Sequence, residues 1–84
     1  MKILSVIPQS NYTLTVEAED GRSGLFDVKP YLGYEAFSTL SIVEEFKKVS
    51  SRGYFIEWDC GADLSADTIE AHMEVNSPDL STIK

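Results

Sequence analysis

The sequence contains few of the residues from which catalytic and metal sites are built, with one cysteine, Cys60, and one histidine, His72, in 84 residues. A single cysteine excludes an internal disulfide and fits a reducing compartment. A thiol nucleophile needs a base within hydrogen-bond reach, and Cys60 follows Asp59, whose carboxylate disfavours the thiolate. Zinc sites need more cysteine or histidine ligands than this pair supplies. We therefore interpret Cys60 as incidental and His72 as a surface residue of a polar helical stretch.

The chain also lacks the loops that hold phosphates or expose a catalytic serine. Its five glycines are isolated at turns, so neither a glycine-rich phosphate loop nor a Gly-x-Ser-x-Gly elbow occurs. Asp59, Asp63 and Asp67 are evenly spaced, but the stretch lacks the ligand order and the closing glutamate of a calcium-binding loop. Neighbouring carboxylates such as Glu44 and Glu45 are typical of a solvated face. We expect no enzymatic activity, no catalytic residue, no metal and no cofactor.

Positive charge is scarce as well. Seven lysines and arginines stand against 14 aspartates and glutamates, which gives a formal net charge of −7. Nucleic acids and anionic membranes are bound by clustered basic residues, and Lys47-Lys48 is the only adjacent pair. We therefore expect no direct nucleic-acid contact and no membrane binding. An acidic surface favours a basic protein partner, although many acidic proteins are simply soluble.

The N-terminal segment has a short apolar run that ends at Pro8. A signal peptide needs a longer apolar stretch and a small-residue cleavage site, and no stretch approaches the length of a membrane span. We expect a cytoplasmic protein.

Against these absences, the hydrophobic content of 43% and the aromatic content of 11% indicate a folded core. Residues 3–7, 12–17 and 25–28 are rich in β-formers, and the middle run alternates apolar and polar residues. Asp20-Gly21, between the second and third runs, is a strong hairpin signal. These patterns predict a three-stranded antiparallel meander.

The second half predicts helices and a hairpin. Tyr34, Phe37 and Leu40 recur every three residues, as on one face of a short helix. Residues 45–51 and 54–59, joined through Arg52-Gly53, predict a β-hairpin. Ser65 is a good N-cap for a C-terminal helix with Asp67 in its first turn.

The expected fold class is α+β: a three-stranded antiparallel meander, a short helix, a β-hairpin and a C-terminal helix in two layers. We expect residues 1–75 to form a single domain and residues 76–84 a loose C-terminal tail.

The aromatic residues divide into core and interface candidates. Base stacking on nucleic acid is one use for such residues, but the net charge opposes it. We assign Phe26, Phe37, Ile56 and Trp58 to the core. The interface candidates combine aromatic residues at turns or on a less buried face with acidic residues on strands; they are Tyr12, Tyr31, Phe55, Glu17, Glu19 and Glu57.

The order of three stretches resembles a small bacterial family known as domain of unknown function 2442. The stretches are residues 11–21, residues 26–33 leading to Phe37, Leu40 and Phe46, and residues 56–69. The last is similar to the family's Trp-Pro-x-Gly-x-Asp-Leu pattern. This chain departs from the family at Asp59, where proline is common, and at Glu70, where tyrosine is common.

The resemblance implies no enzymatic activity and carries over no catalytic residue. Members are often encoded beside a second small protein and have been proposed as antitoxin-like partners, and some carry a C-terminal helix-turn-helix. One hypothesis is therefore an antitoxin-like interaction module that binds a basic protein, encoded by a neighbouring gene, through an acidic surface. The alternative is a homodimeric small-ligand sensor domain of a regulatory system, which an apolar pocket would favour. Homodimerisation fits either hypothesis.

Overall fold

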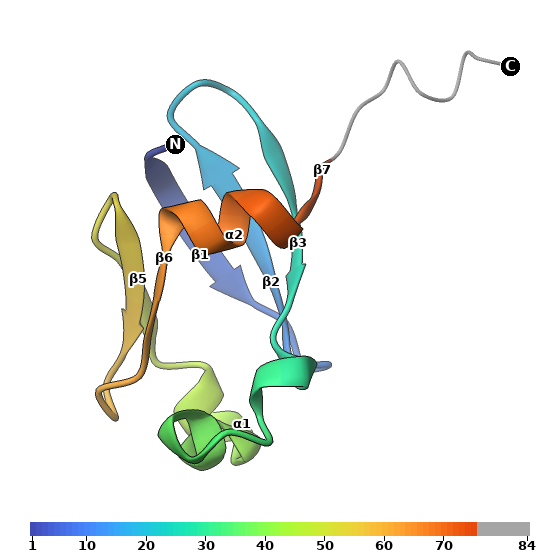
Figure 1. Ribbon diagram of the computed structural model, residues 1–84, viewed down its shortest axis with the longest axis vertical. Coiled ribbons are helices and arrows are strands. Elements are labelled where there is room, and N and C mark those ends of the chain that lie inside the picture. The colour runs from blue at the N-terminus through green and yellow to red at the C-terminus, as the bar shows by residue number, and fades with distance from the viewer. Residues whose placement is uncertain (76–84) are drawn as a thin grey trace, which may run out of the picture.

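The computed structural model describes residues 1–75, which form two antiparallel sheets with short helices around one buried cluster (Figure 1). In chain order the elements are β1 (Ile3–Pro8), β2 (Thr13–Ala18), β3 (Ser23–Asp27), the 3-10 helices η1 (Lys29–Tyr31) and η2 (Glu35–Ser41), α1 (Val43–Phe46), β4 (Val49–Ser51), β5 (Phe55–Trp58), β6 (Asp63–Ser65), α2 (Ala66–His72) and β7 (Glu74–Val75). Sheet A has the order β1-β2-β3-β7 and sheet B the order β4-β5-β6. The α+β class is confirmed. The predicted tail, residues 76–84, lies outside the described residues.

Sheet A follows the alternating pattern of its sequence. Leu14, Val16 and Ala18 of β2 are buried, while the residues between them are more exposed. Leu14 lies opposite Phe26 of β3, which is also buried, because directly paired residues share a face of an antiparallel sheet. The predicted meander is confirmed. The short strand β7, which pairs with β3 through Leu25 and Glu74, was not predicted.

Sheet B contains the predicted hairpin with a shorter first arm. β4 begins at Val49 rather than at residue 45, because the preceding residues form α1 and bury Phe46. The carbonyl of Phe46 accepts a hydrogen bond of 2.9 Å from Trp58 Nε1, which fixes α1 against β5. Gly53 supplies the left-handed φ of +86° that the hairpin turn requires. β6 extends the hairpin to three strands and was not predicted.

The segment predicted as a short helix from the spacing of Tyr34, Phe37 and Leu40 is the 3-10 helix η2. A 3-10 helix has three residues per turn, so residues three apart eclipse one another on one side. Burial rises along that side, from Tyr34 at 63% exposed to Leu40 at 0%. Phe37, predicted to lie in the core, is half-buried and packs against the core's edge.

Helix α2 lies across sheet A in Figure 1 and carries Ala66 and Ile69 into the core. The predicted cap is confirmed, because the Ser65 hydroxyl accepts a hydrogen bond of 3.1 Å from the Thr68 amide. None of the helices within residues 1–75 is both long enough and apolar enough to cross a membrane.

Candidate functional site

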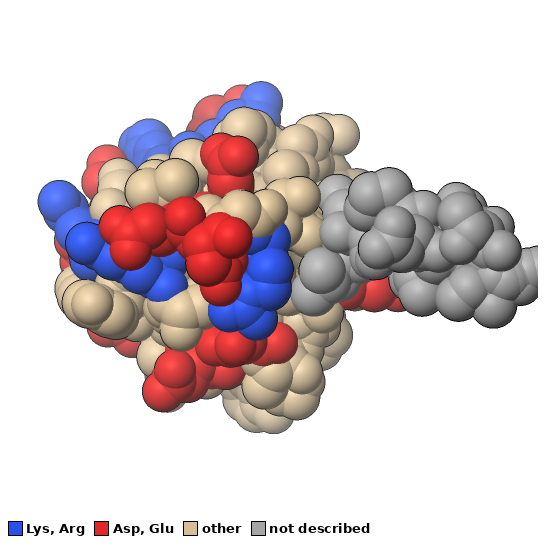
Figure 2. Space-filling model, turned by 90° about the horizontal axis from the view of Figure 1, so that it is seen from above, with Lys and Arg blue, Asp and Glu red and all other residues tan. Residues whose placement is uncertain are grey.

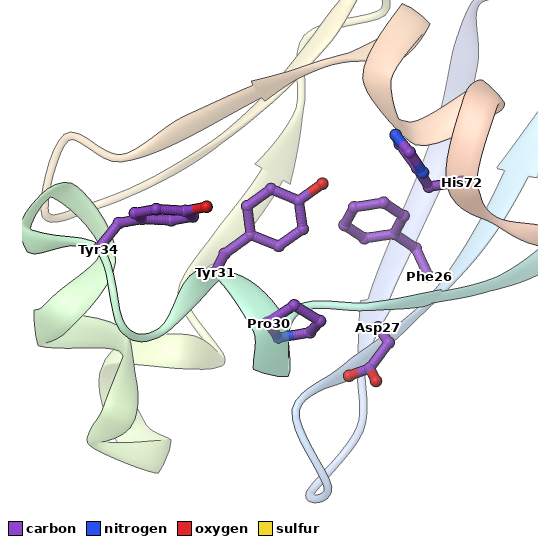
Figure 3. Close-up of a pocket in the computed structure, with 6 residues that line it drawn as sticks. All are labelled: Phe26, Asp27, Pro30, Tyr31, Tyr34 and His72. Carbon is purple, nitrogen blue, oxygen red and sulfur yellow. The ribbon is translucent and has the colours of Figure 1, made fainter.

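A hollow of about 430 Å³ opens where β3, the η1–η2 segment and the end of α2 meet. We call it the aromatic groove; its lining residues are Phe26, Asp27, Pro30, Tyr31, Tyr34 and His72. Figure 3 shows Tyr34, Tyr31 and Phe26 in a row that leads to His72, with Pro30 and Asp27 beneath. Residues from separate parts of the chain therefore build one concave surface.

The floor of the groove arises where β3 ends. Asp27 terminates the strand by accepting a hydrogen bond of 2.9 Å from the Lys29 amide, the geometry of an Asx turn. Pro30 then favours the tight η1 helix, because its ring fixes φ near the helical value. The Tyr31 amide donates to the Val28 carbonyl at 2.8 Å. These local bonds turn the chain so that the Tyr31 ring returns to β3.

Tyr31 is the centre of the aromatic contacts. Its ring centroid lies 5.7 Å from that of Phe26, 5.7 Å from that of Phe37 and 6.4 Å from that of Tyr34. Aromatic pairs at such distances attract beyond simple area burial. Phe26 is 1% exposed and therefore fixed, whereas Tyr34 is 63% exposed and forms the outer wall.

Asp27 forms the charged side of the groove, which adjoins a second hollow along β3 and β7. The Lys29 ammonium lies 3.3 Å from Asp27 Oδ1. A second hollow of about 260 Å³ shares Asp27 and His72 with the groove and adds Thr13, Leu25 and Glu74. The aromatic faces thus continue into a region bordered by two carboxylates, a combination that suits stacking, cation–π contacts and ion pairing.

Two of the predicted interface residues, Tyr31 and Tyr12, make contacts with other aromatic rings. Tyr31 lines the groove. Tyr12 adopts a left-handed φ of 66°, stacks edge-on against Phe46 with centroids 5.2 Å apart, and donates a hydroxyl hydrogen bond to the Ser41 carbonyl. Tyr12 therefore pins the start of β2 to the η2–α1 segment, and most of its ring is engaged inside the molecule.

Phe55 and Glu57 lie on the outer face of sheet B, opposite the buried Ile56 and Trp58. Phe55 is 39% exposed, and Glu57 accepts a hydrogen bond of 2.7 Å from Arg52 Nε. Asp63 of β6 is the direct cross-strand partner of Glu57. The structure therefore adds an unpredicted carboxylate beside these two candidates.

Glu17 and Glu19 lie apart from both groups, at the end of β2 and in the turn that follows. Glu17 accepts a long hydrogen bond of 3.5 Å from the Ser5 hydroxyl, and Glu19 lies 3.8 Å from the Lys2 ammonium. The six candidates thus fall in three groups on different elements rather than in one surface.

Five residues of the groove were not predicted as members of a site: Phe26, Asp27, Pro30, Tyr34 and His72. The three-residue spacing of Tyr31, Tyr34 and Phe37 was a usable signal for the aromatic wall. His72 is exposed, as expected, but its approach to Asp27 depends on how α2 crosses sheet A.

The charges of the chain are unevenly neutralised. Within residues 1–75, the lysines and arginines that pair with carboxylates are Lys2, Arg22, Lys29, Lys48 and Arg52. Figure 2 shows such pairs as neighbouring blue and red residues on one face. In the same part of the chain, the exposed carboxylates without a cation within ion-pair distance are Glu17, Glu35, Glu44, Asp59, Asp63, Asp67 and Glu74.

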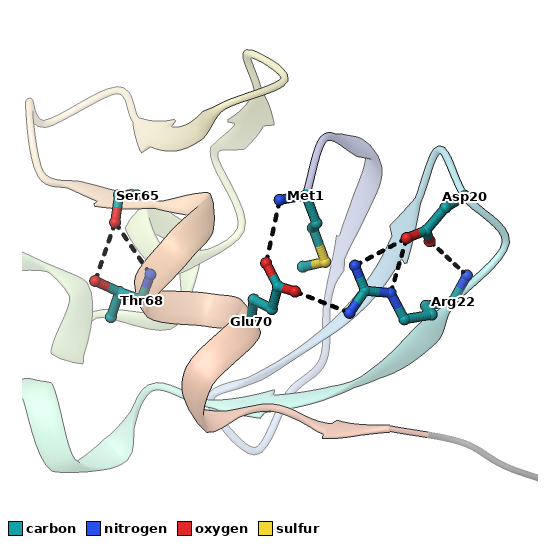
Figure 4. A network of polar contacts seen from close by, with 6 residues as sticks. All are labelled: Met1, Asp20, Arg22, Ser65, Thr68 and Glu70. Atoms are coloured by element: carbon teal, nitrogen blue, oxygen red, sulfur yellow. Dashed lines mark hydrogen bonds and ion pairs between the residues drawn. The ribbon is translucent and has the colours of Figure 1, made fainter.

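Glu70, which stands where the resemblance leads us to expect tyrosine, is the centre of an ion network (Figure 4). Its carboxylate lies 2.9 Å from Arg22 and 3.1 Å from the Met1 amino group, and Arg22 also lies 2.8 Å from Asp20. The hydrogen bond from Arg22, with that from the amino group, lowers the pKa of Glu70. Arg22 likewise lowers the pKa of Asp20. The network joins α2 to the β2–β3 turn.

Among the residues that the structure describes, no three or more histidine, cysteine or carboxylate side chains gather in a way that could hold a metal ion.

A family model described as "Protein of unknown function (DUF2442)" matches residues 3–74. Neither a curated protein nor a solved structure gives a match.

Proposed function

Because the chain belongs to the DUF2442 family of proteins of unknown function, we propose from its own surface that it is a non-catalytic protein-interaction module. In this role it is antitoxin-like: it binds a basic protein partner, encoded by a neighbouring gene, through its acidic surface. The observation that carries the proposal is the distribution of charge. All but one of the basic residues in residues 1–75 are held in internal ion pairs, while seven exposed carboxylates have no cation partner.

This distribution leaves a negative field that intramolecular pairing does not cancel. A partner's lysines and arginines would be attracted to the free carboxylates and would meet little competing positive charge. Such steering weakens as salt screens the field.

Sheet B provides a second argument. Glu57 and Asp63 face each other directly across β5 and β6. Like charges in that position destabilise a sheet, and here Arg52 relieves only Glu57. A cationic partner would relieve Asp63 as well, and the neighbouring exposed Phe55 offers an apolar anchor.

The test is a light-scattering mass of the pure protein, alone and after co-expression with the product of the adjacent gene. The expected result is a complex with the neighbour that dissociates progressively as sodium chloride is raised from 0.15 M, where the Debye length is about 8 Å, towards 1 M, where it is about 3 Å. A chain that stays monomeric in both samples would contradict the proposal.

The aromatic groove favours one second candidate, the homodimeric small-ligand sensor. Its volume of about 430 Å³ lies within the range of about 300–1,000 Å³ that small-molecule sites occupy. A homodimer that ignores the neighbour in the same mass measurement would favour this function and direct the search to ligands.

A further inference from the structure

We propose that the aromatic groove is a receptor for one positively charged side chain, an arginine guanidinium or a lysine ammonium, presented by the protein partner. The inference rests on the proposed function, because it names the chemistry by which a basic partner would be held. It selects the groove rather than the outer face of sheet B as the specific recognition point.

The rings supply the first part of the argument. A cation placed over an aromatic face within about 6 Å of the centroid is attracted by the ring's quadrupole. The faces that a ligand can reach belong to Tyr31 and to the exposed Tyr34, whose centroids lie 6.4 Å apart. The buried Phe26, 5.7 Å from Tyr31, holds the Tyr31 ring in place. Preorganised rings lose little entropy when a ligand binds.

Residues 1–75 already contain one such interaction. The Lys2 ammonium lies 5.9 Å from the ring centroid of Tyr54, which is the most exposed tyrosine at 70%. The Tyr31 and Tyr34 rings have no such intramolecular cation in the described part of the chain.

Asp27 supplies the second part. Both of its contacts with Lys29 use Oδ1, from the amide at 2.9 Å and from the ammonium at 3.3 Å. No hydrogen bond or ion pair within residues 1–75 engages Oδ2. Figure 3 shows the carboxylate on the side of β3 away from the Phe26 ring, beside Pro30, so this oxygen can accept a hydrogen bond from a guanidinium or ammonium group at the rim of the groove.

Glu74 supplies the third part. It borders the adjoining hollow, is exposed and has no cation partner among the described residues. Two carboxylates beside an aromatic surface repel an anionic ligand and favour a cation over a neutral aromatic molecule.

The experiment is a ¹H–¹⁵N NMR titration with Nα-acetyl-arginine methylamide and with the neutral, isosteric Nα-acetyl-citrulline methylamide. The arginine probe is expected to shift the amide signals of Asp27, Tyr31, Tyr34 and His72 and to bind at least several-fold more tightly than the citrulline probe. Equal binding of the two probes, or no shift of the groove signals, would overturn the inference.

Two substitutions locate the probe. Tyr34→Ala removes an exposed ring and should weaken arginine binding by about two- to fivefold, the range of an exposed cation–π contact. Asp27→Asn, which keeps an oxygen for the Lys29 amide, should weaken it by a similar factor. Tyr54→Ala is the matched control, because it removes an exposed tyrosine outside the groove, and it should leave the affinity unchanged. Unaltered binding to Tyr34→Ala and Asp27→Asn would overturn the inference.

The mass measurement with the neighbouring protein separates the two proposals. A complex that forms with the wild type and weakens with Tyr34→Ala supports both. A complex that forms equally well with Tyr34→Ala overturns the groove as the recognition point and leaves the interaction module standing. Specific binding of the arginine probe without any complex supports the receptor and contradicts the choice of partner.

Discussion

At the residue scale, single buried side chains connect the strands to the helices, and Trp58 is the main example. Trp58 is 2% exposed, contacts the rings of Phe46 and Phe37 at centroid distances of 6.2 and 6.3 Å, and donates from Nε1 to the Phe46 carbonyl. A buried carbonyl that loses its donor costs more than the bond itself contributes. One indole thus fixes both the aromatic cluster and the path of α1.

Replacing that indole tests its role. Trp58→Phe should lower the free energy of unfolding by about 2–4 kcal/mol, because it leaves the Phe46 carbonyl without a donor and opens a small cavity. Urea denaturation followed by far-UV circular dichroism measures the change. Tyr54→Phe, at an exposed position, should alter stability by less than about 0.5 kcal/mol. A loss below about 1 kcal/mol for Trp58→Phe would show that the hydrogen bond is dispensable.

Backbone conformation gives a second test at this scale. Gly61 has a φ of +100° in the turn between β5 and β6, whereas Gly33 has no positive φ, and an added Cβ meets nothing within 4 Å at either site. Gly61→Ala should therefore destabilise by about 1–2 kcal/mol through backbone strain alone. Gly33→Ala should change stability by less than about 0.5 kcal/mol. Equal effects in thermal unfolding would mean that strain at Gly61 is not the cause.

At the element scale, the short helix α2 depends on contacts at its beginning and along its side. It has only seven residues, too few to be stable on propensity alone. Ser65 caps its start, Ile69 packs into the core, and Glu70 joins it to Arg22 and the β2–β3 turn. α2 also carries His72 to the groove, so the position of the helix sets the shape of the candidate site.

The Glu70 network predicts how stability depends on pH. The folded-state pKa values of Glu70 and Asp20 lie below their ordinary values of 4.5 and 3.8. Their contribution is therefore fully present above about pH 4.5 and is lost as the pH falls through the lower folded-state values. Urea unfolding at pH 7, 4.5 and 3 should show this loss. Glu70→Gln should reduce the difference between pH 7 and pH 3, whereas Glu35→Gln, at an exposed carboxylate without an ion-pair partner, should preserve it.

At the scale of the whole molecule, the internal ion pairs of residues 1–75 engage every lysine and arginine except Lys47 and leave an acidic surface. Asp59, Asp63 and Asp67 follow one another through the β5–β6 turn, β6 and the first turn of α2, all exposed and without a cation partner in the described chain. In the proposed complex, these charges would act together as a field that steers the basic partner, rather than as separate bonds.

Neutralising this region should weaken the complex. The triple variant Asp59→Asn, Asp63→Asn, Asp67→Asn should raise the dissociation constant for the neighbouring protein at 0.15 M salt and reduce its dependence on salt. Titration calorimetry or light scattering measures both. The double variant Glu17→Gln, Glu35→Gln serves as a control for charge on other elements. If the double variant weakens binding as much per removed charge as the triple variant does, the net charge of the protein, rather than the Asp59–Asp67 region, determines association.

The sequence by itself determined the features that depend on neighbours along the chain. Alternation in residues 12–17, the Asp20-Gly21 turn and the Ser65 cap are short-range patterns, and each matches the structure. The family is also correct, since its model matches residues 3–74. The net charge follows from composition alone.

The tertiary structure decided what depends on distant residues. β6 and β7 are too short to show a strand pattern in the sequence. They form because the edges of β5 and β3 offer them backbone hydrogen-bond partners. In the 3-10 helix η2, Phe37 and Leu40 stand three residues apart and both pack on the core, so the core selects this tighter helix. The groove exists only where α2 brings His72 beside Asp27, 45 residues earlier in the chain. Local free energies select turns and caps, whereas the closure of the chain around one core selects which side chains meet.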